Sequence, residues 1–117
     1  MGAGTSSGKA VLGEARTYDE FQFMRSGMTS QARKAVAKNV NQAKFTNVND
    51  ATGQSRRLTV DRQNAEIRRG DPAQSERYTV RVWHDYGWTT PQQVEVRGTL
   101  AQAEKKAREL VRKKLGV

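Results

Sequence analysis

Residues 77–84 show the clearest pattern in the chain, because apolar and polar side chains alternate there with the two-residue period of a β-strand. One face of this strand carries Tyr78, Val80 and Val82, and the other carries Arg77, Thr79, Arg81 and Trp83. A turn is expected at Gln63 and Asn64. Shorter alternating runs predict further strands at about 43–48, 56–62, 64–69 and 92–98. We therefore expect an antiparallel meander of about five strands within residues 43–98.

Two segments show helical spacing instead. Residues 29–40 place small apolar residues three and four positions apart after a possible N-cap, Thr29, and predict a short helix. Residues 99–115 predict a longer one, in which Thr99 and Gln102 fit a capping box. Its apolar stripe consists of Leu100, Ala103, Ala107, Leu110, Val111 and Leu115.

The N-terminal part of the chain is less regular. Residues 9–24 alternate in part and include bulky β-forming residues such as Phe21 and Phe23, which predicts a β-hairpin. Residues 1–8 are rich in Gly, Ser and Thr and are expected to be mobile unless an assembly holds them. The whole pattern predicts one α+β domain over residues 1–117, with a C-terminal helix packed on the sheet or on a partner subunit.

Composition limits how much core this domain can form. Hydrophobic residues make up 35% of the 117, the net charge is +9, and the mean hydropathy is −0.87. Such a chain is expected either to stay partly flexible or to complete its core with another chain. A pI near 10.4 indicates an anionic partner, with nucleic acid first and an acidic protein or a membrane surface behind it.

Several classes of function are disfavoured. The chain has no cysteine and one histidine, His84, so a zinc site is not expected. Asp85 follows His84 on a strand and would point to the opposite face, so the histidine is interpreted as a structural or surface residue. No nucleophile elbow or phosphate-binding loop is present. We expect no enzyme, no cofactor and no small-molecule substrate. No apolar run has the roughly 18 residues of a membrane span, and the start does not resemble a secretory signal, so a cytoplasmic protein is expected.

The polar face of residues 77–84 is the main candidate site. Its guanidinium and hydroxyl donors recur at every second residue and suit the phosphates of RNA, while Trp83 could stack on an unpaired base. Arg68 and Arg69, on the strand expected to pair with it, add charge. Two alternatives stay open: an ordinary solvated face, and burial of Trp83 at a subunit interface. The basic helix end at residues 112–114 is expected to be a solvated surface that the helix dipole favours.

Three stretches of the chain, in this order, resemble one protein family. They are AVLGEART (Ala10 to Thr17), IRRGDPAQSERYTVRVW (Ile67 to Trp83) and VEVRGTLAQAEKKARELVRKKL (Val94 to Leu115). They are similar to the coat proteins of small single-stranded RNA bacteriophages. The resemblance implies an N-terminal hairpin, a five-stranded meander and C-terminal helical cover. It also implies a homodimer whose two sheets run together. Many such dimers would close into a shell.

In that family the inner sheet face binds an RNA hairpin. Carried over, Arg68 would be the basic residue of the first hairpin strand, and the second strand would contribute Arg77, Thr79 and Arg81. The first hypothesis is therefore a virion coat protein, assembled in the host cytoplasm, that dimerises, forms a shell and binds genomic RNA. The alternatives are a small basic nucleic-acid-binding regulator and an accessory structural module without nucleic acid.

Overall fold

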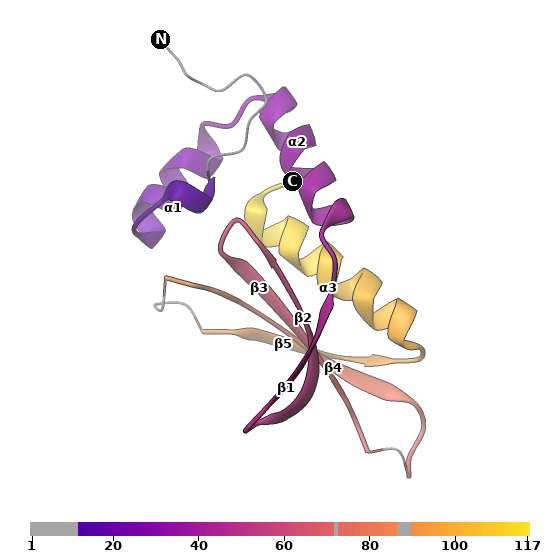
Figure 1. The fold of residues 1–117 in the computed structure, drawn as a ribbon. Helices are drawn as coiled ribbons and strands as arrows, with labels where there is room; N and C mark the ends of the chain where they lie inside the picture. The colour runs from indigo at the N-terminus through magenta and orange to yellow at the C-terminus, as the bar shows by residue number, and fades with distance from the viewer. Residues whose placement is uncertain (1–11, 72, 87–89) are drawn as a thin grey trace.

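The computed structural model describes residues 12–71, 73–86 and 90–117, so the expected mobility of residues 1–8 concerns a segment outside the described residues. Helices stand at both ends of the chain and strands between them (Figure 1). In chain order the elements are η1 (Leu12–Glu14), α1 (Tyr18–Ser26), α2 (Ser30–Gln42), β1 (Thr46–Asp50), β2 (Gly53–Val60), β3 (Gln63–Arg69), β4 (Arg77–His84), β5 (Gln92–Arg97) and α3 (Leu100–Leu115).

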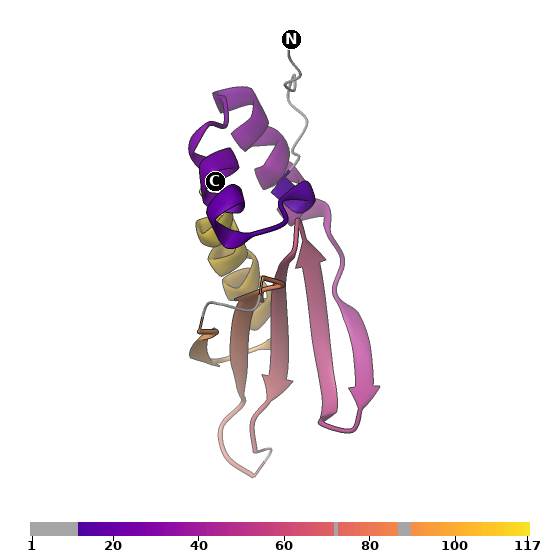
Figure 2. The same cartoon turned by 90° about the vertical axis from the view of Figure 1, so that its left-hand side faces the viewer.

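The five strands form one antiparallel meander in the order β1-β2-β3-β4-β5. Helix α3 packs against β3 and β4 on one face of this sheet, and α2 packs against α3. The two N-terminal helices gather at one end of the sheet, while the β1–β2 and β3–β4 turns lie at the other (Figure 2). The α+β prediction is confirmed, with α3 on the sheet of its own chain.

The predicted hairpin over residues 9–24 is wrong: its first residues lie outside the described part, and the rest forms η1 and the start of α1, joined by residues 15–17. The hydroxyl of Thr17 accepts a hydrogen bond from the Glu20 amide (3.1 Å) and caps the first turn of α1. A helix turns by about 200° over two residues. Phe21 and Phe23 therefore point in different directions, and the first is fully buried whereas the second is 77% exposed.

The two predicted helices are confirmed, because local capping signals agree with the packing. At the start of α2 the Thr29 hydroxyl accepts from the Ala32 amide (3.0 Å). At the start of α3 the Thr99 hydroxyl accepts from the Gln102 amide (3.2 Å), and the Gln102 side chain accepts from the Thr99 amide (2.8 Å). Helix α3 ends at Gly116, whose left-handed conformation (φ 79°) an L side chain would disfavour.

The core forms within a single chain. The apolar stripe of α3 faces the inward side chains of β2, β3 and β4, and α1 and α2 close its end. Arg108 of α3 donates hydrogen bonds to the carbonyls of Val40 (2.6 Å) and Ala43 (2.7 Å), which ties the end of α2 to α3. The largest fully buried side chains are Phe21, Leu12, Leu115, Gln63, Val36, Val40, Val80, Val82 and Val111.

The turn between β2 and β3 lies at Asp61 and Arg62, so the prediction of a turn at residues 63–64 is wrong. Both turn residues have positive φ angles, 49° and 65°, as a two-residue type I′ hairpin requires. Arg62 is held there by two bonds, because its Nε donates to the Gly13 carbonyl (2.7 Å) and its own carbonyl accepts from the Asp85 amide (3.0 Å). This turn fixes the register of β3 and hence which of its side chains share a face with those of β4.

Candidate functional site

The face of the sheet opposite α3 is called the open face below, because the helices α2 and α3 lie on the other side (Figure 1). Strand register places Arg68 beside Thr79, Glu66 beside Arg81 and Asn64 beside Trp83. Between them Tyr78, Val80 and Val82 point into the core. The sequence-predicted site residues therefore all lie on the open face: Arg68, Arg77, Thr79, Arg81 and Trp83.

Arg68 is engaged within the protein. Its Nε donates to Glu66 Oε1 (2.8 Å), and its terminal nitrogens donate to the carbonyl and the hydroxyl of Thr52 (2.6 Å each). Glu66 also accepts from Arg57 Nη2 (2.9 Å). The hydrogen bond from Arg68 is the main reason why the pKa of the buried Glu66 carboxyl lies below its usual value, followed in the same direction by the charges of Arg68 and Arg57 and opposed by burial. Arg68 therefore stabilises the carboxylate beside the site.

Arg77 holds a looser contact with its neighbours. Its Nη1 lies 3.7 Å from Glu95 Oε2 on β5, and the same carboxylate lies 3.8 Å from Arg97 Nε. Such long, solvent-accessible ion pairs contribute little stability. The Arg77 guanidinium can therefore exchange this carboxylate for a phosphate at low cost.

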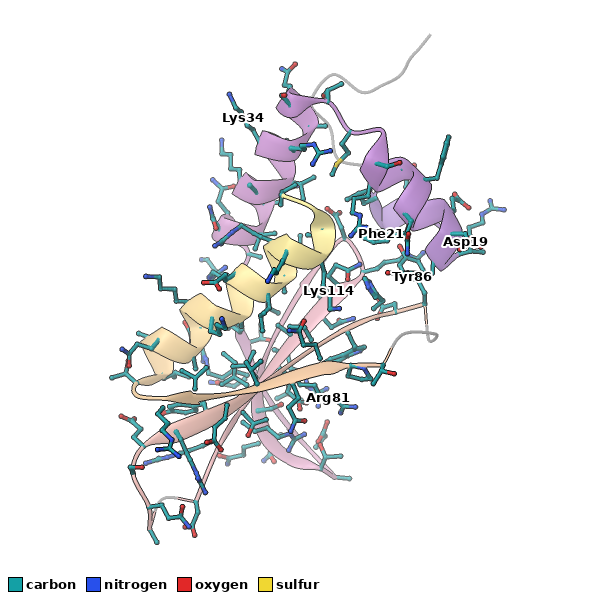
Figure 3. The ribbon with its side chains drawn as sticks, turned by 180° about the vertical axis from the view of Figure 1, so that it is seen from behind. Asp19, Phe21, Lys34, Arg81, Tyr86 and Lys114 are labelled. Atoms are coloured by element: carbon teal, nitrogen blue, oxygen red, sulfur yellow. The ribbon has the colours of Figure 1, made fainter. Side chains whose placement is uncertain are left out.

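Arg81 is the exposed cation of the open face. It projects on the side of the sheet away from α3 (Figure 3), and its guanidinium carbon lies 5.8 Å from the centroid of the Trp83 ring. Its cross-strand neighbour Glu66 is held by two other arginines. Among the described residues, Arg81 has no carboxylate within ion-pair distance. Arg81 and Trp83 together thus offer a free cation and a partly exposed aromatic surface.

Positive charge is stronger on the helical layer than the sequence analysis anticipated. Helix α2 carries basic side chains and no acidic ones, and in α3 basic residues outnumber acidic ones. On the open face, by contrast, Glu66 and Glu95 offset part of the arginine charge. The basic residues of the two helices are Arg33, Lys34, Lys38, Lys105, Lys106, Arg108, Arg112, Lys113 and Lys114.

His84 lies in an aromatic cluster, as a structural histidine would. It is 5% exposed, and its ring centroid lies 5.0 Å from that of Tyr18, 5.3 Å from Phe21 and 5.8 Å from Tyr86. Burial, reinforced by nearby lysine and arginine charges, lowers the pKa of His84 to about 4. The carboxylate of Asp85 accepts from the Asn64 amide (2.7 Å). His84 is therefore neutral at pH 7, and Asp85 is hydrogen-bonded elsewhere.

This histidine makes stability depend on pH. Its folded pKa of about 4 lies below the ordinary value of 6.5, so the unfolded chain takes up the proton first as the pH falls. The stabilisation is complete above about pH 6.5 and is lost progressively towards pH 4. Urea unfolding at pH 7.5 and at pH 5 should show this loss, and His84→Phe should reduce it. Equal losses in the two proteins would contradict the assignment.

Within the part of the chain that the structure describes, no group of three His, Cys, Asp or Glu side chains is placed to hold a metal ion. No helix among these residues combines the length and apolar character needed to cross a membrane. Comparison of the chain with protein-family models, with curated proteins and with solved structures found no match in any of the three. The resemblance to phage coat proteins therefore stays a prediction.

Proposed function

We propose that the protein binds single-stranded or hairpin RNA on the open face of its sheet, with Arg81 and Trp83 at the centre of the site. The observation that supports this most is the pairing of an exposed, carboxylate-free guanidinium with a partly exposed indole on one strand. RNA-binding sheets use the same combination, in which an aromatic ring stacks on a base and a cation meets the backbone.

The rest of β4 extends this site along the strand. Side chains two residues apart on one face stand about 7 Å from each other, so Thr79 and Arg77 continue the row of donors away from Arg81. The Glu66 carboxylate, held by Arg57 and Arg68, lies beside the row and stiffens β2 and β3. A rigid sheet loses little entropy when it orders a flexible RNA strand.

A coat protein is the second candidate, and the sheet edges favour it. Strands β1 and β5 each have one neighbour in the sheet, and every residue of β1 is exposed or half-buried. Unpaired edges let the sheets of two copies join. The helical N-terminus differs from the hairpin that the coat-protein resemblance implies. The coat proposal therefore depends on the sheet and its edges.

The mass of the purified species distinguishes a coat protein from a small nucleic-acid-binding regulator. Light scattering and absorbance at 260 and 280 nm would be measured on protein purified without nuclease or a high-salt wash. Large uniform particles that contain nucleic acid would support a coat protein. A monomer or dimer that binds RNA with a steep salt dependence would support the regulator. A small species without affinity for RNA would overturn both and leave the accessory structural module.

Substitution of the two central residues tests the site. Trp83→Ala is expected to weaken binding of a fluorescein-labelled dodecauridylate roughly tenfold to a hundredfold, because one stacked base contributes about 1–3 kcal/mol. Arg81→Ala should weaken binding about tenfold and reduce the salt slope by about 1. Fluorescence anisotropy at several salt concentrations measures both effects.

Lys34→Ala is the matched control, because it removes one charge from an exposed position on α2 (Figure 3). It should change the affinity less than twofold, and all three variants should keep the circular dichroism of the parent. A larger loss from Lys34→Ala than from Arg81→Ala would place RNA on the helical layer and overturn the proposal.

A further inference from the structure

A second site lies on the other side of the sheet from the open face. A pocket of about 250 Å³ opens where α1, the end of β4, the start of β5 and the last turn of α3 meet. Lys114 extends from α3 towards this end of the sheet, near Phe21 and Tyr86 (Figure 3). The pocket, called the basic pocket below, is lined by Tyr18, Arg25, His84, Gln92, Lys113 and Lys114.

The charge of this pocket is entirely positive. Arg25, Lys113 and Lys114 contribute cations from two helices, and none of the lining residues that the structure describes is acidic. Arg25 Nη1 donates to the Lys114 carbonyl (2.9 Å), and its guanidinium carbon lies 5.7 Å from the centroid of the Phe21 ring. These contacts fix the guanidinium beside the pocket, so the convergence of like charges is built into the fold.

His84 lines the pocket and carries a buried polar atom without a partner among the described residues. Its ring is 5% exposed, and its Nδ1 is buried without a hydrogen-bond partner among the described residues. A buried polar atom left without a partner destabilises a protein. The ring lies next to the cations of the pocket, so its ionisation responds to the charge that the pocket holds.

We propose that the basic pocket binds a phosphoryl group. The two lysines and Arg25 supply three positive charges for its double negative charge, and charge-assisted hydrogen bonds to phosphate oxygens are among the strongest available to a protein. His84 and Gln92 line the pocket from the sheet side, opposite the cations that the two helices contribute. This proposal does not depend on RNA binding at the open face.

Ionisation of His84 provides the signal by which binding is detected. Arg25 from α1 and Lys114 from α3 disfavour the charged imidazole, Asp85 favours it, and Tyr18, Phe21 and Tyr86 surround the ring. A bound dianion offsets the cationic field of the two basic groups. Occupancy should therefore raise the pKa of His84.

The experiment uses the histidine as a reporter, because the chain contains one histidine. The Cε1–H resonance of His84 is followed by NMR while inorganic phosphate replaces chloride at constant ionic strength. A saturable shift and a higher pKa in the phosphate-bound protein are expected. Lys114→Gln should weaken phosphate binding about tenfold, because it removes one charge-assisted contact. Lys34→Gln removes the same charge from α2 and should leave the affinity unchanged.

Two RNA probes distinguish the sources of the phosphoryl group. A hexauridylate with a 5′-phosphate that shifts His84 more than its 5′-hydroxyl counterpart would assign the pocket to a nucleic-acid end. A response to inorganic phosphate alone would assign it to the free ion. Arg81→Ala should keep the response, which separates this site from the open face. The proposal is overturned if neither inorganic phosphate nor the phosphorylated hexauridylate shifts His84 beyond the chloride control, or if the two lysine variants lose affinity equally.

Discussion

Phe21→Ala is expected to lower the free energy of unfolding by about 3–5 kcal/mol, the usual range for deletion of a buried phenyl ring. Phe21 is fully buried and contacts the His84 and Tyr86 rings (centroids 5.3 and 5.5 Å). Its removal leaves a cavity where α1 meets the sheet, and rigid strands cannot close it. Urea unfolding followed by circular dichroism measures the loss.

Phe23→Ala is the matched control. The ring of Phe23 is 77% exposed on the same helix, so its loss should change stability by no more than about 0.5 kcal/mol. On a β-strand, residues 21 and 23 would share one face and respond alike. Similar effects of the two substitutions would therefore contradict helix α1 and restore the hairpin interpretation.

Leu110→Ala should lower the free energy of unfolding by about 2–5 kcal/mol. Leu110 is 3% exposed and belongs to the stripe with which α3 covers β3 and β4. Leu100→Ala deletes the same atoms at a half-buried position in the first turn of α3. Chemical denaturation should show a clearly smaller loss of stability for Leu100→Ala than for Leu110→Ala. Equal losses would show that the helix packs on the sheet through a different face.

Elements with dense local signals could be predicted from the sequence. The alternation in β4 and the capping box of α3 involve neighbours within a few residues, and both agree with the burial that the fold imposes. The Thr29 cap of α2 belongs to the same class. In each case the local preference and the tertiary environment favour the same conformation.

The N-terminal error has a definite physical cause. The bulky residues Phe21 and Phe23 suggested a strand, but Thr17 and Glu20 form the S/T-x-x-E spacing that starts a helix. The Thr17 hydroxyl accepts a hydrogen bond from the Glu20 amide, and the acidic residues of the first turn interact favourably with the helix dipole. The S/T-x-x-E spacing predicts this segment better than its aromatic residues do, because the threonine side chain satisfies a backbone N–H at the start of the helix.

The candidate site could be predicted in part. The two-residue period is enough to place Arg81 and Trp83 on one face, and it also places Glu66 beside Arg68. It cannot show that Arg68 reaches Thr52, because that contact depends on the β1–β2 turn and on the pairing of β2 with β3. The basic pocket combines residues from Tyr18 to Lys114. No sequence spacing connects such distant positions, and only the packing of α1 against the sheet end brings them together.

The packing of the N-terminal helices on α3 constrains the order in which the protein can fold. Each strand of the meander pairs with the next one along the chain, so the sheet can form by short loop closures as the polypeptide lengthens. Helix α2 is different, because its partner is the last helix of the described chain. During synthesis, the apolar side of α2 therefore stays uncovered until all five strands and α3 have left the ribosome.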